Sequence, residues 1–387
     1  MELHERNVPS LTRRQLLRVG GVSLVGGFVN GFRPLNVYTQ EKVRPMGTAR
    51  QVLFVNIDGG MSQIDTLDAK EGSWTPGEFE IRRFSNGVTL PSALMSNLTE
   101  VLDKVTIVRS LTAWDAVHGR AQYYIQTGHP LNLALSKEIP AIGAVVAHEL
   151  AKERNPSDSL PAYIAMNTER NQAGVVNQGF LSAEFGPMSL SVTDGPPEMV
   201  RGMDESLERR WKRLQQLDQV FRKGDDKLDR SFTDYHEYYK SAWAIMKDPR
   251  VGEIFTISEE NKVRYGDSAI GNSLILARNL LRADAGTRFI LASHPGWDHH
   301  SNLPTRIAAQ CRDTDQGSAA LVRDLEQRGL LEDTLVIWGG EFGRTVFCQG
   351  ELTATNYGRD HHPRCFTVWM AGAGLRPGFS YGKTDDF

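Results

Sequence analysis

Short apolar runs alternate with stretches of helical periodicity along this 387-residue chain, and this alternation restricts the fold more than any other feature. Runs typical of buried strands lie at residues 51–57, 105–108, 162–166, 287–292, 334–338 and 365–370. Apolar residues at helical spacing lie at 90–102, 121–125, 142–153, 268–281 and 316–328. Strands that alternate with helices form a mainly parallel sheet covered by helices on both faces. The sequence therefore predicts an α/β fold.

The composition is that of an ordinary globular protein and argues against several functional classes. The chain is 40% hydrophobic and 24% charged, with a net charge of −3. It has no extended basic stripe, so we expect no nucleic-acid partner. The three cysteines, Cys311, Cys348 and Cys365, show no Cys-x-x-Cys spacing, so neither a zinc knuckle nor a disulfide scaffold is expected.

The N-terminus has the pattern of an export signal. Arg13 and Arg14 form a twin arginine, and an uncharged run rich in Gly and Val follows at residues 19–32. This run suits the apolar region of a signal peptide, and the arginine pair is typical of the Tat pathway. The alternative is an amphipathic helix, but the glycines make the run a weak soluble helix. We expect residues 1–46 to be a Tat signal and linker, recognised by the Tat translocase. The protein would then be periplasmic or extracellular, or membrane-anchored if the signal is uncleaved.

Residues 196–262 differ in character from the rest of the domain predicted at 47–387. They are dense in Arg, Lys, Glu and Asp, with Leu, Trp and Tyr at helical spacing. We predict two or three amphipathic helices there, forming a helical cap or insertion with a solvated charged face. The chain stops after residues 383–387 without a closing helix, and we expect its C-terminus to be truncated.

Two clusters of nearly the same make-up combine an aspartate with histidines. The first holds Asp298 with His300, and the second holds Asp360 with His361 and His362. Aspartate and histidine offer oxygen and nitrogen ligands to a divalent metal. Two such clusters are difficult to explain as solvated surface, so we predict that both contribute to one metal centre.

Two further carboxylates follow predicted strands. Asp58 follows the run at 51–57, and Glu341 follows the run at 334–338. Ligand-binding groups gather at the carboxyl ends of strands in α/β sheets. Asp58 could also be only a turn residue before two glycines, and Glu341 could form a structural ion pair with Arg344. The predicted ligands are Asp58, Asp298, His300, Glu341, Asp360, His361 and His362, for one or two divalent ions. This donor set favours zinc or manganese, with calcium or magnesium as alternatives.

In combination, these motifs resemble the DUF1501 family. The likeness is carried by residues 55–65, 296–301, 340–345 and 358–363, and it extends from about residue 12 to the C-terminus. The resemblance implies a Tat-exported protein of uncharacterised role. The family in turn resembles the alkaline phosphatase and sulfatase superfamily, which implies an alkaline-phosphatase-like core and a two-metal hydrolytic ancestry.

The superfamily resemblance also implies metal-binding roles. Asp58 matches the first metal-binding Asp, and Asp298 with His300 resembles the pair that binds one metal. Glu341 stands where the Asp of the Asp-His-Gly motif would be. Phe342 stands where its His would be and cannot bind a metal. His361 or His362 resembles the final metal-binding His.

The nucleophile of this superfamily has no clear counterpart. The chain has no Cys-x-Pro-Ser-Arg sequence, so formylglycine chemistry is not expected. Counting back from the helix end at Thr127, the nucleophile position falls on His118, which could be a ligand, a general acid or an unusual nucleophile. Ser62 and Thr66 are weaker nucleophile candidates. Arg120 or Arg344 would pair with an anionic oxygen of the substrate.

Taken together, these features predict an exported, metal-dependent hydrolase of the two-metal type. Its substrates would be phosphate or sulfate esters, either small molecules or anionic polymers. The alternative is a non-catalytic protein that keeps the metal and binds sulfated or phosphorylated extracellular polymers. The departure at Phe342 and the absent nucleophile support this alternative.

Overall fold

The computed structural model describes residues 47–168, 176–193, 205–222, 230–349, 353 and 356–385, without the side chains of residues 218–222 and 230–233. The chain divides between residues 46 and 47, and all of these residues belong to the second unit. The export signal expected at residues 1–46 lies outside the described residues. None of the helices in the described part combines the length and the apolarity needed to cross a bilayer.

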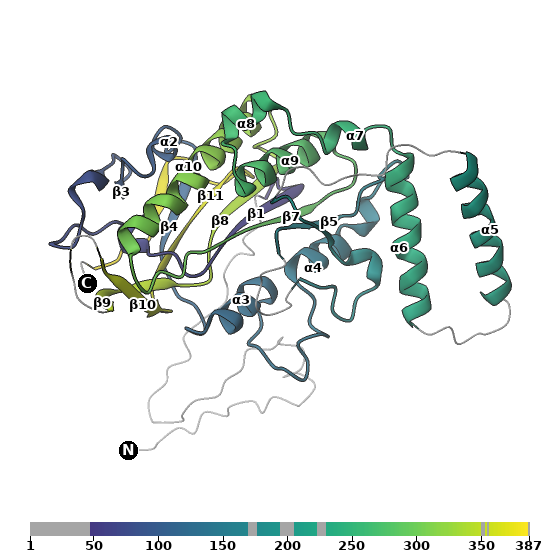
Figure 1. Ribbon diagram of the computed structural model, residues 1–387, viewed down its shortest axis with the longest axis horizontal. Helices are drawn as coiled ribbons and strands as arrows, with labels where there is room; N and C mark the ends of the chain where they lie inside the picture. Colours follow the sequence, from purple (N-terminus) through teal and green to yellow (C-terminus); the bar gives the residue numbers. More distant parts are fainter. Residues whose placement is uncertain are drawn as a thin grey trace, which may run out of the picture. The chain divides into compact units, whose positions relative to one another are not determined.

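An eight-stranded sheet runs through this unit (Figure 1). Its strand order is β12 (Phe379–Tyr381), β4 (Val105–Leu111), β11 (Phe366–Ala371), β8 (Thr334–Gly339), β1 (Gln51–Asp58), β7 (Phe289–Pro295), β5 (Tyr163–Met166) and β6 (Met188–Leu190). Strand β1 lies between β7 and β8 and is parallel to both. Among the described strands of this sheet, only β11 is antiparallel to its neighbours. The predicted α/β class with a mainly parallel sheet is therefore confirmed.

Strand β1 is buried on both faces, which explains its nearly continuous apolar sequence. Successive side chains of a strand point to opposite faces. Leu53, Val55 and Ile57 accordingly join the larger core cluster, and Phe54 joins a smaller cluster on the other face. The central position of β1 fixes where its C-terminal residue, Asp58, emerges from the sheet.

Helices cover both faces of the sheet (Figure 1). The larger cluster contains residues of α9 (Ala269–Ala283) and α10 (Leu303–Gln327), and the smaller one contains residues of α4 (Ile142–Glu149) and α3 (His118–Thr127). Helix α3 ends at Gly128, whose φ of 71° is the left-handed conformation that favours glycine. Short helical turns complete the layers at α2 (Ser96–Thr99), α7 (Val251–Ile254), α8 (Glu259–Tyr265), η1 (Gln63–Asp65), η2 (Gly77–Phe79), η3 (Ala151–Glu153) and η4 (Ala183–Phe185).

The helix expected at residues 90–102 is mostly replaced by other structure. Strand β3 (Thr89–Pro91) pairs with β2 (Ile81–Arg83), and only α2 (Ser96–Thr99) is helical in this stretch. Proline lacks the backbone N–H that a helix interior requires, so Pro91 is better accommodated in the strand than in a helix.

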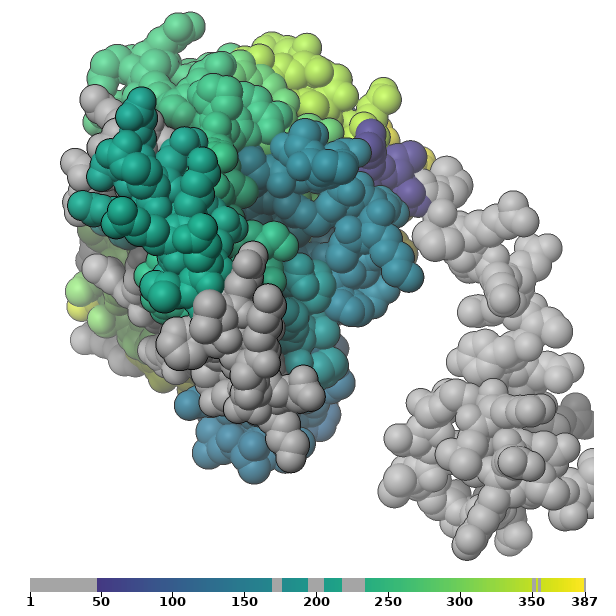
Figure 2. All heavy atoms as spheres, turned by 90° about the vertical axis from the view of Figure 1, so that its right-hand side faces the viewer, coloured from purple at the N-terminus to yellow at the C-terminus, as the bar shows by residue number. Residues whose placement is uncertain are grey.

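Two long helices occupy part of the charged segment at 196–262. These are α5 (Glu205–Arg222) and α6 (Arg230–Lys247), drawn in teal on the face shown in Figure 2. The ring of Trp211 on α5 stacks on that of Trp243 on α6, with centroids 4.7 Å apart. Aromatic residues at helical spacing therefore join the two helices, while their charged residues remain at the surface, as in an amphipathic pair.

A separate two-stranded sheet precedes β11. Strand β9 (Gly343–Gln349) is antiparallel to β10 (Gly358–His362), and Arg344 lies opposite His361. No strand is predicted from the sequence over these polar residues. Their pairing brings both polar motifs of the C-terminal region to the same place.

Candidate metal centre

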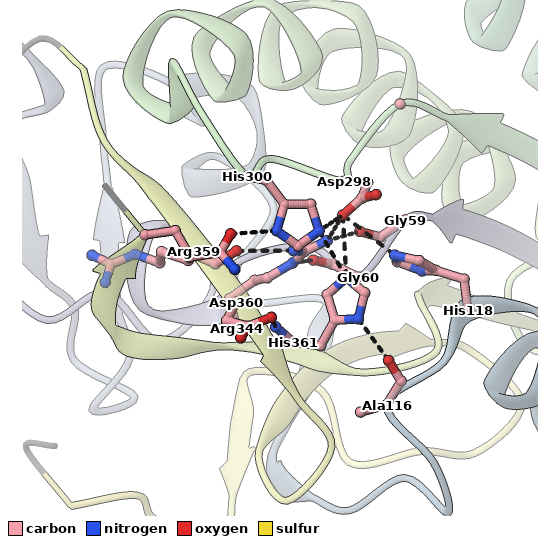
Figure 3. A network of polar contacts seen from close by, with 12 residues as sticks. Gly59, Gly60, Ala116, His118, Asp298, His300, Arg344, Arg359, Asp360 and His361 are labelled. Carbon is pink, nitrogen blue, oxygen red and sulfur yellow. Dashed lines mark hydrogen bonds and ion pairs between the residues drawn. The ribbon is translucent and has the colours of Figure 1, made fainter. Parts of the chain in front are cut away.

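Four side chains from three segments of the chain converge beyond the C-terminal end of β1 (Figure 3). His118 opens α3, Asp298 and His300 follow β7, and His361 lies on β10. Each offers one ligand atom, and the four atoms lie within 4.8 Å of one another. Oδ1 of Asp298 lies 2.7 Å from Nε2 of His300 and 3.3 Å from Nε2 of both His118 and His361.

Hydrogen bonds behind two of these histidines determine which ring nitrogen faces the cluster. Nδ1 of His118 lies 2.6 Å from Oε1 of Glu341, and Nδ1 of His361 lies 2.6 Å from the carbonyl oxygen of Ala116. Carboxylate and carbonyl oxygens can only accept, so both Nδ1 atoms carry hydrogen and donate. In the neutral imidazole, the Nε2 atom that faces Asp298 is then an acceptor.

The third histidine follows the same pattern. Nδ1 of His300 donates to the amide oxygen of Gln349 at 2.5 Å, which makes its Nε2 an acceptor as well. This Nε2 lies 2.9 Å from Nε2 of His361. In their neutral forms, three imidazole lone pairs and the carboxylate of Asp298 therefore face one another. The guanidinium of Arg344 lies beside them, 2.5 Å from Asp298 and 3.4 Å from Nε2 of His300, and a bound cation would pair with all four atoms.

A metal ion fits these four atoms. Metal–ligand bonds of 2.0–2.2 Å in a tetrahedral site place neighbouring ligand atoms about 3.3 Å apart, as Asp298 lies from His118 and His361. The 2.7 Å to His300 is shorter, so this pair would separate around an ion. Metal-binding histidines usually donate their other ring nitrogen to a carboxylate, carbonyl or similar acceptor, as all three do here. The mixture of imidazole and carboxylate suits zinc or manganese.

The electrostatics also indicate a site for positive charge. Burial alone would lower the pKa of His118, but the hydrogen bonds and charges of Asp298 and Glu341 raise it to about 9. Burial would raise the pKa of Asp298, yet the hydrogen bonds from His118, His361 and Arg344 hold it well below its usual range. Without a metal, a proton on His118 therefore provides the positive charge that the cluster requires.

Arg344 forms an ion pair with Asp298. Its side chain is fully buried, with Nη2 2.5 Å from Oδ1 of Asp298. The same guanidinium donates to the carbonyl oxygens of Gly59, Gly60 and Arg359 at 2.6, 2.7 and 3.0 Å. Because these N–H groups already have partners, Arg344 is placed to orient Asp298. Its hydrogen bonds do not support the expected contact between Arg344 and a substrate oxygen.

The turn after β1 brings the loop that carries Asp298 close to β1. Gly59 has a φ of 121°, and a Cβ atom there would lie 2.6 Å from the backbone nitrogen of Asp298. Only glycine fits such a conformation and such a close approach. The glycine that follows Asp58 therefore has a role in forming the site.

Three of the expected site residues lie outside the four-residue cluster. Asp360 is exposed and accepts from the backbone nitrogen of His361 at 2.8 Å. His362 lines a separate small cavity near Cys365. Both flank His361 on β10. Strand alternation turns His362 to the opposite face, and Asp360 lies at the irregularity in the β9–β10 pairing between Arg359 and His361. Arg120 is exposed and pairs with Asp115 at 3.3 Å.

Asp58 and Glu341 also lie outside the cluster but beside it. The amide nitrogen of Gln122 donates to both, at 3.0 Å to Asp58 and 2.8 Å to Glu341. Burial and the charge of Glu341 raise the pKa of Asp58 to about 6. Gln122 was not predicted as a site residue from the sequence. The one sequence feature that points to it is its position four residues after His118, which places both side chains on the same face of α3.

The remaining candidates have structural contacts. The phenyl ring of Phe342 lies 4.8 Å from the ring centroids of both His118 and His361, so it supports these imidazoles. Ser62 is buried and donates to Asp65 at 2.5 Å, and Thr66 donates to the carbonyl oxygen of Ser62 at 2.6 Å. Neither hydroxyl faces the cluster as a nucleophile would.

Comparisons with known proteins identify a family. The family model described as "Protein of unknown function (DUF1501)" matches residues 49–387. No curated protein matches the sequence.

Solved structures with a similar backbone include several hydrolases. The alkaline phosphatase from the Antarctic bacterium TAB5 has 12% identity and a TM-score of 0.38, covering 87% of this chain and 94% of that one. The PsFucS1 sulfatase from Pseudoalteromonas sp. has 14% identity and a TM-score of 0.35, covering 87% and 65%. The phosphonate monoester hydrolase SpPMH from Silicibacter pomeroyi has 12% identity and a TM-score of 0.38, covering 86% and 69%. At TM-scores below 0.5, these similarities carry no conclusion about activity.

Proposed function

Because the chain belongs to the DUF1501 family, whose role is unknown, we propose its function from the metal centre itself. We propose a metal-dependent hydrolase of phosphate or sulfate esters. The observation that carries this proposal is the convergence of three Nε2 atoms and one carboxylate oxygen on a single point. The sequence resemblance to the alkaline phosphatase and sulfatase superfamily supports the choice of substrate class.

The residues of the site would have distinct roles. His118, Asp298, His300 and His361 would hold the ion, and Glu341 would orient His118. When bound, a divalent ion supplies Lewis-acid stabilisation of charge on an ester oxygen. The side chains of Asp298 and His300 are 43% and 39% exposed, so an anionic ester can reach the cluster from solvent.

One observation favours the alternative, a non-catalytic metal protein that binds anionic polymers. Structural zinc sites usually have four protein ligands, whereas catalytic sites keep a position open for water or substrate. The cluster offers four protein ligands. A hydrolase therefore requires a fifth position or the release of one ligand.

Metal analysis of the purified chain, followed by assays on an aryl phosphate and an aryl sulfate, separates the two functions. Bound metal with turnover that His118→Ala abolishes supports the hydrolase. Bound metal without turnover, together with retention on a sulfated polysaccharide, supports the binding protein. His148→Ala is the matched control because His148 is exposed on α4, where it pairs with Glu149 and contacts the ring of Phe185. It should keep both metal and turnover.

We further propose export by the Tat pathway, with residues 196–262 as an insertion in the domain. Support for export comes from Arg13, Arg14 and the uncharged run at 19–32. In a fractionation experiment, the wild-type chain should leave the cytoplasm, and the double variant R13K/R14K should remain there. Equal export of both chains would contradict the proposal.

A further inference from the structure

We propose that the centre binds a single metal ion, because the amide of Gln122 stands between Asp58 and Glu341 where a second cation would be needed. The pair of carboxylates beside the cluster would otherwise suit a second ion. This inference concerns the number of ions and does not require that the protein is a hydrolase. It rests on the hydrogen bonds of the two carboxylates and on the packing beside them.

Both carboxylate oxygens of Glu341 are already engaged by protein donors. Its Oε1 accepts from the backbone nitrogen of Gly59 at 3.1 Å and from Nδ1 of His118 at 2.6 Å. Its Oε2 accepts from the same Gly59 nitrogen at 3.3 Å and from Gln122 at 2.8 Å. A carboxylate has about four lone-pair sites, and three N–H groups of the protein occupy both oxygens, with that of Gly59 shared between them. The side chain is also fully buried, so Glu341 is a positioning residue for His118.

A hydrogen bond from Asn56 supports this orientation of the Gln122 amide. Its oxygen accepts from Nδ2 of Asn56 at 3.2 Å, and both side chains are buried. Reversing the amide would turn its oxygen toward Asp58 and Glu341 and its nitrogen toward another donor. The two N–H groups of Gln122 therefore bridge the carboxylates, as a small cation would.

Phe342 blocks the other approach to the pair of imidazoles. Its ring is 1% exposed and lies against both His118 and His361. The contact with Gly60 is so close that a Cβ atom there would lie 2.5 Å from the phenyl ring. Phe342 offers no ligand atom on that side, so a second ion beside Asp58 would have to displace either this ring or the amide of Gln122.

Titration of the purified full-length chain with Zn²⁺ and then Mn²⁺ tests this inference. We expect one Zn²⁺ per chain by elemental analysis and no further Mn²⁺ bound by electron paramagnetic resonance. Gln122→Glu replaces the bridging donor with a third carboxylate, and hard oxygen ligands suit Mn²⁺. This variant should bind one additional Mn²⁺. Gln327→Glu, at an exposed position on α10, is the matched control and should bind none.

The outcomes separate this inference from the proposed function. Two ions of similar affinity in the wild-type chain would overturn the single-metal inference and leave the metal centre intact. A folded Gln122→Glu chain that binds no additional Mn²⁺ would overturn the role of Gln122. A folded wild-type chain that binds no ion at all would instead remove the basis of the proposed function. If Gln122→Glu does not fold, the wild-type titration still decides the number of ions.

Discussion

Two polar clusters lie side by side around the β9–β10 hairpin, and they differ in how their charges are matched. In the first, Arg359 donates to Asp65 through Nε at 2.5 Å and Nη2 at 3.1 Å. Ser62 and Tyr357 donate to the same carboxylate at 2.5 and 3.1 Å. Every acceptor of Asp65 faces a donor, so the cluster is complete without a ligand.

The second cluster surrounds Asp298 and is joined to the first by the hydrogen bond from Arg344 to the carbonyl oxygen of Arg359. Arg344 is a donor to Asp298, but three histidines also turn Nε2 toward this carboxylate, and each is a further acceptor when its imidazole is neutral. This difference shows that buried charge alone does not identify a metal-binding site. Acceptors that face one another do identify one, because they require a cation.

The largest expected effect comes from a substitution that disrupts the first cluster and leaves the second intact. Arg359→Met should lower the free energy of unfolding by about 3–5 kcal/mol, because it leaves the carboxylate of Asp65 buried without its charged partner. Urea unfolding of the metal-free chain measures this change. Arg82→Met, in an exposed pair with Glu80, should cost about 0–1 kcal/mol. Loss of metal binding in a stably folded Arg359→Met chain would contradict the separation of the clusters.

Metal should stabilise the second cluster. At a free Zn²⁺ concentration of 100 times its Kd, the free energy of unfolding should rise by about 2.7 kcal/mol. Thermal unfolding of the wild-type chain with Zn²⁺ and with a chelator measures the shift. A His361→Ala chain should show little shift. An equal shift in that variant would place the metal elsewhere.

The hydrogen bond behind His118 should have a smaller effect. Glu341→Gln keeps the size of the side chain but removes the carboxylate that orients the imidazole, so metal affinity should fall about 10- to 100-fold. Competition with a chromophoric chelator measures the affinity. The absorption spectrum of the Co²⁺-loaded chain should also change if the geometry at His118 changes. Unchanged affinity and spectrum would show that Glu341 has no positioning role.

The smallest expected effect belongs to a more exposed pair. Hydrogen bonds from Arg250 lower the pKa of Asp248 to about 2 from its usual 3.8. A carboxyl whose pKa is lower in the folded state contributes stability above its unfolded pKa, and that contribution is lost as the pH falls toward 2. The Tm difference between wild type and Asp248→Asn should therefore be constant above about pH 5 and shrink below pH 4. A difference that grows on acidification would contradict this sign.

The sequence predicted the elements that are held by apolar burial. Strands β1, β7, β8 and β11 correspond to continuous apolar runs, and their pattern identifies them without tertiary information. Hairpin β9–β10 could not be found in this way. Residues such as Arg344 and Arg359 are buried there by hydrogen bonds and ion pairs, which leave no period in the sequence.

The site shows the same limit. Asp298, His300 and His361 were identifiable because aspartate and histidine stand together in their motifs. The difference between His361 and its neighbour His362 depends on which face of β10 each occupies, and no strand was predicted there from the sequence. Gln122 was missed because a neutral amide belongs to no metal-binding pattern. Its importance depends on the two carboxylates that the fold brings to it.

The central claim is that mutually facing acceptors around Asp298 form a metal site. Elemental analysis of the purified wild-type and His118→Ala chains, after dialysis with a small excess of Zn²⁺, tests it most directly. The wild-type chain should retain about one ion and the variant should lose it, with both folded by circular dichroism. A folded wild-type chain with no bound ion, or a His118→Ala chain that keeps its ion with the same affinity, would contradict the claim.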